Sequence, residues 1–175
     1  MDNHQDSTKT LVHALVASRL DYCDSVFFKI NATSLRALQS VLNAAARLIT
    51  RKRKFDHISK TLRDELHWLP VQQRIQYKLC TLVYKSIHHT APKYISQLCV
   101  PVSNIIGRSH LRSAAHGDLQ IPATNTVTLG PRSFAVAGPM TWNSLPTFLR
   151  DSTLTLKQFQ SRLKTHLFSI AYVTC

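Results

Sequence analysis

Apolar residues recur at intervals of three and four along most of this chain, and this spacing constrains the fold more than any other feature. Such spacing places apolar side chains on one face of a helix. It predicts helices over about residues 8–28, 33–50, 58–66, 70–87, 132–142 and 155–168. We therefore expect a mainly α fold, an irregular helical bundle.

Local signals refine these helices. Thr33 or Ser34 is expected to cap the second helix, and Pro70 suits the first turn of the fourth, where a missing N–H costs nothing. Thr155 and Gln158 form a capping-box pattern at the start of the last helix. In the first helix, four apolar residues fall on one stripe and are expected to face the core: Leu11, Leu15, Tyr22 and Val26.

The helical spacing disappears between about residues 101 and 130. Four apolar residues there alternate with polar neighbours, which is the pattern of half-buried strands: Leu119, Ile121, Val127 and Leu129. We expect a small β-hairpin between about residues 118 and 129. The predicted organisation is then a helical bundle over 1–100 and a terminal segment over 101–175, with the hairpin and C-terminal helices, packed as one unit.

The charge balance is strongly basic. The chain has 22 Lys and Arg against 9 Asp and Glu, a net charge of +13. The excess is present in 1–55 (nine against four), in 56–100 (six against three) and in 101–175 (seven against two). Solubility does not require so large an excess, whereas a surface that follows a phosphate backbone does. The expected partner is nucleic acid, RNA or DNA.

The candidate nucleic-acid contacts are basic residues in or beside predicted loops: Arg47, Arg51, Lys52, Arg53, Lys54, Arg108, Arg112 and Arg132. The run Arg51–Lys54 is the densest and is expected in an exposed loop between helices. It can be a phosphate clamp, a nuclear-import signal or a solvated loop tip. Trp68 and Trp142 lie beside leucine and proline and are expected in the core rather than stacked on bases. His67 is interpreted as a structural histidine.

No constellation of residues predicts catalysis or metal binding. Two-metal phosphoryl transfer needs closely placed carboxylates, but no two aspartates are adjacent and the Asp21/Asp24 pair lacks a third carboxylate. The four glycines are too scattered for a phosphate loop. The four cysteines show no metal-ligand spacing and are expected to be buried and reduced: Cys23, Cys80, Cys99 and Cys175. We expect no catalytic residues, no metal, no cofactor and no small-molecule substrate.

Targeting features point inside the cell. The N-terminus is polar, unlike a signal peptide, and no apolar run is long enough to span a membrane. We expect a protein of the nucleus or cytoplasm with no membrane partner.

Three groups of motifs occur in a fixed order. The first joins Ser18–Cys23 and Asn43–Leu48, the second is Glu65–Ile75 with Trp68 and Pro70, and the third begins at Trp142–Pro146 and continues through Phe159 and Leu163–Phe168. In this order, from about Leu11 to Phe168, they resemble the C-terminal region of LINE-type (non-LTR) retrotransposon reverse transcriptases of the Jockey and chicken-repeat group. Trp68, Pro70, Trp142 and Pro146 are the structural signature of the resemblance.

The resemblance implies that the part up to about Val100 is similar to the polymerase thumb and the rest to the terminal domain. The palm with its catalytic aspartates is expected to be absent, so the chain is expected to be a non-catalytic remnant that binds nucleic acid. Two alternatives stay open. Without a palm, the apolar thumb face is exposed and favours self-association or a partner helix, or the chain is the inert product of a truncated element.

Overall fold

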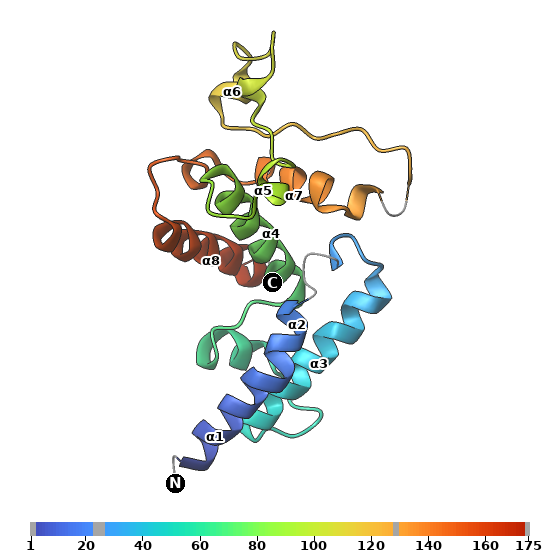
Figure 1. Ribbon diagram of the computed structural model, residues 1–175. Helices are drawn as coiled ribbons and strands as arrows, with labels where there is room; N and C mark the ends of the chain where they lie inside the picture. The colour runs from blue at the N-terminus through green and yellow to red at the C-terminus, as the bar shows by residue number, and fades with distance from the viewer. Residues whose placement is uncertain (1–2, 23–26, 128–129, 174–175) are drawn as a thin grey trace.

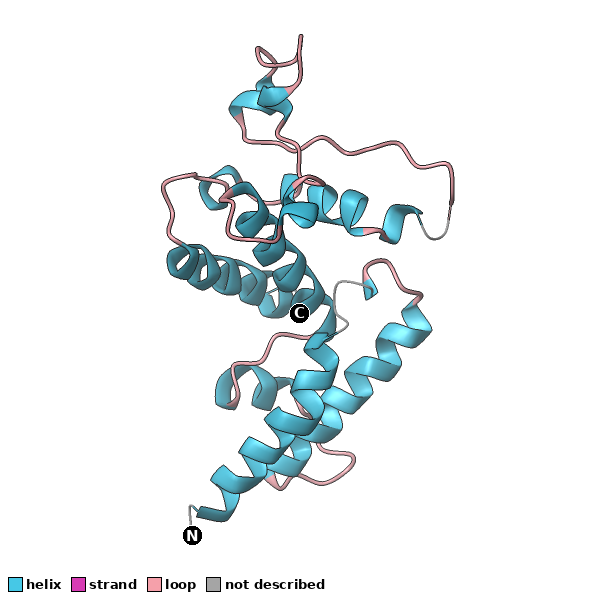
Figure 2. Cartoon of the chain, in the orientation of Figure 1, coloured by secondary structure: helices cyan, strands magenta, loops and turns pink. Residues whose placement is uncertain are grey.

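The computed structural model describes residues 3–22, 27–127 and 130–173 of the chain and contains eight α-helices (Figure 1). Helices and connecting loops make up the described part of the chain, and no strand is drawn there (Figure 2). The predicted mainly α fold is confirmed. None of the described helices is long and apolar enough to cross a membrane.

The chain begins with α1 (Asn3–Val12), a π-helical turn η1 (His13–Ala17) and α2 (Ser18–Tyr22), which run on from one another (Figure 1). The predicted inward stripe is wrong, because Leu11, Leu15 and Tyr22 are exposed. Val12 and Leu20 are buried instead, with Val16 packed beside them. Val12, Val16 and Leu20 are spaced four residues apart, so they share one face of the helical segment, and α1 and η1 pack against α3. Val26 lies outside the described residues.

The next helix, α3 (Ala32–Thr50), packs against α1 and η1. Its cap is Asn31, whose side chain accepts a hydrogen bond of 2.7 Å from the Ser34 N–H. The predicted cap at Thr33 or Ser34 is therefore wrong, since both residues lie inside the first turn. Leu42, Ala46 and Ile49 form the buried face, and the helix ends at Arg51 in the left-handed conformation.

Helix α4 (Val71–Ile87) begins directly after Pro70, which precedes the first turn rather than lying in it as predicted, and the helix links two apolar clusters. Its first half contributes to the cluster built with α3 and a second π turn, η3 (Thr61–Glu65). Its second half contributes Cys80, Val83 and Tyr84 to the cluster built with α7 (Phe134–Asn143) and α8 (Leu156–Val173). Residues before and after position 100 thus pack on the same helix.

The second cluster is centred on Phe159, which is fully buried. Tyr84 stacks on the Phe159 ring at 4.6 Å, and the Trp142 ring lies 5.7 Å away. Trp68, in the first cluster, and Trp142 are both buried, which confirms their predicted place in the core. The predicted capping box at Thr155 and Gln158 is also confirmed, since each accepts a hydrogen bond from the other's backbone N–H.

Close packing between α7 and α4 explains why residue 138 is a glycine. A Cβ on Gly138 would lie 3.0 Å from Cγ2 of Val83 on α4 and 3.2 Å from the Phe134 ring. The glycine therefore lets α7 approach α4 at this point. Pro139 follows it, and α7 nevertheless runs as one helix through both residues.

The predicted β-hairpin between residues 118 and 129 is wrong. Leu119 instead forms an isolated antiparallel bridge with Pro101, flanked by hydrogen bonds from Val102 to Asp118 and from Gln120 to Val100. The free edge of Leu119 is taken by the Asn143 side chain, which both accepts from its N–H (2.9 Å) and donates to its carbonyl (2.8 Å). No backbone group of Leu119 is left for a strand at 127, and residues 121–127 are exposed. Leu129 lies outside the described residues.

The remaining elements between α4 and α7 are short. They are α5 (Lys93–Ser96), the single turn η4 (Val102–Asn104), α6 (Arg112–Ala115) and the single turn η5 (Gly130–Arg132), while η6 (Thr147–Leu149) follows α7. Cys80 and Cys99 are free and buried, as predicted, and burial raises the pKa of both thiols. Cys23 and Cys175 lie outside the described residues.

Candidate nucleic-acid interface

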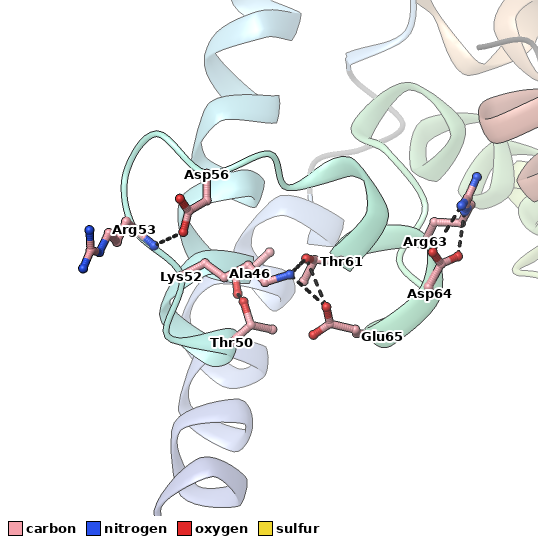
Figure 3. Close-up of polar contacts among 9 residues, drawn as sticks. All are labelled: Ala46, Thr50, Lys52, Arg53, Asp56, Thr61, Arg63, Asp64 and Glu65. Carbon is pink, nitrogen blue, oxygen red and sulfur yellow. Dashed lines mark hydrogen bonds and ion pairs between the residues drawn. The ribbon is translucent and has the colours of Figure 1, made fainter.

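The basic loop, defined here as Arg51–Lys54, follows α3 and lies at the lower end of the molecule (Figure 1). Lys52 is directed inward: its Nζ lies 2.8 Å from Oε1 of Glu65 and also donates to the hydroxyl of Thr61, which is fully buried (Figure 3). One of the four consecutive charges is therefore a structural group that ties the loop to η3.

The other basic residues around this loop are of two kinds: one binds the backbone of the loop, and the others are exposed to solvent. Arg47 donates from Nη2 to the backbone carbonyl of Asp56 at 3.1 Å, so it closes the loop from within. The Arg53 side chain points away from the neighbouring contacts (Figure 3), and its backbone forms two hydrogen bonds with Asp56: the Arg53 N–H donates to the carboxylate at 2.7 Å, and the Arg53 carbonyl accepts from the Asp56 N–H at 3.2 Å. Arg51 and Lys54 are exposed, and Lys54 lies 5.6 Å from the Phe55 ring centroid. The loop offers three solvated cations rather than a cluster of four.

The other predicted contacts lie far from this loop. Arg108 and Arg112 are exposed beside and on α6, at the upper end of the molecule (Figure 1). Arg132 is half-buried at the end of η5, before α7. The structure thus does not bring the eight predicted residues onto one surface.

A different set of cations meets in what we call the basic groove, a depression of about 470 Å³ bounded by α1, η1, the segment 66–69, α4 and α8. Four cationic side chains line it: Lys9, Arg74, Lys78 and Lys164. They are joined there by two histidines and two of the aromatic residues, His13, His67, Trp68 and Tyr77. None of the described residues lining the groove is acidic.

The floor of the groove is held by contacts around Trp68. The Arg74 guanidinium lies over the Trp68 ring at 5.6 Å from its centroid and donates from Nε to the Leu69 carbonyl at 3.1 Å. The His13 ring meets the same indole edge-on at 5.6 Å. These contacts fix the Arg74 guanidinium and the Trp68 ring at the floor of the groove.

The two π turns in the described residues lie beside this groove. His13 begins η1, and His67 follows η3 by two residues. A π turn re-aims the side chains around it, and such turns recur at functional sites. His67 is exposed and has a φ of 51°, in the left-handed region that a non-glycine residue adopts at a cost of about 1–2 kcal/mol. The sequence predicts that His67 is a hydrogen-bonded structural histidine; its ring is instead exposed and lies 6.3 Å from the Phe168 ring.

The two acids of η3, which precede His67 in sequence, are paired with cations outside the groove. Asp64 is bound by Arg63 (2.6 Å) and Glu65 by Lys52, and these hydrogen bonds lower the pKa of each carboxyl group. Burial raises the pKa of Tyr77, so its phenol is neutral at physiological pH. Three of the cations, Lys9, Lys78 and Lys164, are exposed to solvent, and no described residue lining the groove is acidic.

Sequence reasoning missed the groove residues because they come from three separate helices. Lys78 and Lys164 were visible only as members of polar outer faces, and Lys9 as a single charge. A weak signal existed in Glu65–Ile75, since this stretch holds His67, Trp68 and Arg74 together. Of the signature residues, Trp68 and Trp142 are core, whereas Pro70 and Pro146 precede α4 and η6.

Comparison with known proteins did not identify a relative of this chain. No protein-family model matches this chain, and neither a curated protein nor a solved structure matches it. Among the described residues, no group of three or more His, Cys, Asp and Glu side chains could hold a metal ion.

Proposed function

We propose that this protein binds the phosphate backbone of nucleic acid through the basic groove, and that it corresponds to the C-terminal region of a LINE-type reverse transcriptase, supplying nucleic-acid contacts rather than catalysis. The observation that carries the proposal is the convergence of Lys9, Arg74, Lys78 and Lys164 on one concave surface with no acidic lining residue among those described. The family origin rests on the order of the sequence motifs alone.

The spacing of the cations around the basic groove suits a nucleic-acid backbone better than a single compact anion. The cations come from different walls of the groove, and Arg74 and Lys78 lie four residues apart on one face of α4. Cations distributed in this way neutralise successive phosphates and release their counterions, which makes affinity fall with salt and depend weakly on sequence. The net charge of +13 adds long-range attraction.

The test compares two lysine pairs on the same helices. Lys78→Ala with Lys164→Ala removes groove charges, and Lys85→Ala with Lys157→Ala removes one charge from α4 and one from α8 outside the groove. Binding of a single-stranded oligonucleotide is followed by fluorescence anisotropy over a range of salt concentrations. Each phosphate contact contributes about 0.7 to the log–log slope, so the groove pair should lower the slope by about 1.4.

The control pair should leave the slope nearly unchanged, because its lysines lie outside the groove. Equal losses from both pairs would mean that only net charge matters, and they would contradict the proposed site. An absence of salt-dependent binding in the wild-type protein would contradict the proposed function itself.

Self-association is a second candidate, favoured by the exposed apolar face of the first helix. Leu11, Leu15 and Tyr22 lie along that face, and the Tyr22 side chain is 85% exposed. Such a stripe is typical of a helix that packs on another surface. Analytical ultracentrifugation should show a dimer that Leu11→Ser with Leu15→Ser converts to monomer. A monomeric wild-type protein at high concentration would exclude this candidate.

A further inference from the structure

A second hollow adjoins the basic groove and differs from it in chemistry. It has a volume of about 490 Å³ and is lined by seven residues of η3, the segment after it and α8: Arg63, His67, Lys164, Thr165, Phe168, Ser169 and Tyr172. We call it the aromatic hollow. His67 and Lys164 line both depressions, so the two are continuous across these residues.

The rings of the aromatic hollow are held in place by the core. The Phe168 and Tyr172 rings lie 4.8 Å apart with a tilt of 54°, and Phe168 is half-buried against the second cluster. The Tyr172 hydroxyl donates to the backbone carbonyl of Trp68 at 2.7 Å. Burial raises the pKa of Tyr172 to about 12, so the ring presents a neutral face at physiological pH. These two side chains form a rigid aromatic wall.

His67 stands at the boundary between the two depressions. Its left-handed backbone is fixed by a hydrogen bond of 2.8 Å from the Trp68 N–H to the Leu62 carbonyl, which closes the turn after η3. Its exposed ring lies 6.3 Å from the Phe168 ring. Backbone conformations of this kind cluster at ligand-binding positions. The turn thus places a planar side chain beside both the aromatic wall and the cations.

We propose that the aromatic hollow holds a base unstacked from a single strand of nucleic acid whose phosphates lie in the basic groove. This inference rests on the proposed function. A base needs an aromatic face for stacking and its phosphate needs cations, and here the two requirements are met on either side of His67 and Lys164. The hollow falls within the volume range of sites for small organic ligands.

The inference predicts which form of nucleic acid binds more tightly. A duplex keeps its bases stacked inside, so only its phosphates reach the protein, whereas a single strand can place a base on Phe168 and Tyr172. The protein should therefore prefer single strands to duplexes of equal charge, and strands with bases to strands without them.

The experiment uses the full chain and two single strands of equal length and equal phosphate number, one of thymidine nucleotides and one of abasic sugar-phosphate units. The abasic strand should bind about tenfold more weakly, since one stacked base contributes roughly that factor. Phe168→Leu keeps an apolar side chain in the cluster but removes the aromatic face, and it should weaken only the strand with bases. Tyr94→Leu, which alters an exposed aromatic residue outside both depressions, is the matched control.

Each outcome separates the hollow from the groove. Equal affinity for the two strands, with both weakened by Lys78→Ala and Lys164→Ala, would overturn the base site and leave backbone binding intact. Equal weakening of both strands by Phe168→Leu would show a structural effect and also overturn it. Absence of binding to either strand would overturn the proposed function and the inference together. A 2-aminopurine base placed in the strand should change its fluorescence on binding to the wild-type protein and not on binding to Phe168→Leu.

Discussion

The basic loop and the basic groove are both rich in positive charge, but they differ in what that charge does. In the loop, Lys52 binds Glu65 and the buried Thr61 hydroxyl, so the most noticeable run of charge in the sequence is partly structural. In the groove, cations from α1, α4 and α8 converge, and none of the described lining residues is acidic. Charge density along a sequence and charge density on a surface are therefore different quantities, and we expect the second one to decide where a phosphate backbone binds.

Charge reversal should give the largest difference between the two regions. Lys78→Glu with Lys164→Glu and Arg53→Glu with Lys54→Glu both lower the net charge by four, from +13 to +9, because each substitution changes it by two. The groove variant should lose about a hundredfold in affinity for single strands near 0.1 M salt, since it removes two phosphate contacts and adds repulsion. The loop variant should lose less than tenfold, through the weaker long-range field alone.

Both variants have the same net charge, so a difference between their affinities shows which of the two regions contacts the nucleic acid. Affinities from anisotropy titrations, with circular dichroism to confirm folding, provide the measurement. A larger loss from the loop variant would return the binding surface to Arg51–Lys54 and contradict the account.

A smaller effect should separate structural from solvated charge within the loop itself. Lys52→Ala removes the donor to the fully buried Thr61 hydroxyl, and the loss of that hydrogen bond should cost about 1 kcal/mol of unfolding free energy. Arg53→Ala keeps the backbone hydrogen bond to Asp56 and should leave stability unchanged within experimental error. Urea denaturation measures both variants, and equal stabilities would mean that Lys52 is solvated like its neighbours.

Much of the fold was predictable from local patterns. The spacing of apolar residues locates the helices, and Pro70 and the Thr155–Gln158 pair mark two of their starts. The burial of Trp68 and Trp142 follows from their apolar neighbours in sequence. These features depend on residues close together in the chain, which is why the sequence alone reveals them.

The errors come from contacts between distant residues. The inward face of the first helix depends on its packing against α3, and the absent hairpin depends on the Asn143 side chain, which occupies the edge of Leu119 from 24 residues away. The groove likewise depends on Lys9, Lys78 and Lys164 meeting through the packing of three helices. No local pattern contains this information.

The most direct test of the central claim is lysine protection in the wild-type protein. The free protein and its complex with a single-stranded oligonucleotide are treated briefly with an acetylating reagent, and modification is measured at each lysine by mass spectrometry. We predict that binding protects Lys9, Lys78 and Lys164, while Lys54, Lys85 and Lys157 react equally in both samples. Protection of Lys54 with no change at Lys78 and Lys164 would contradict the account.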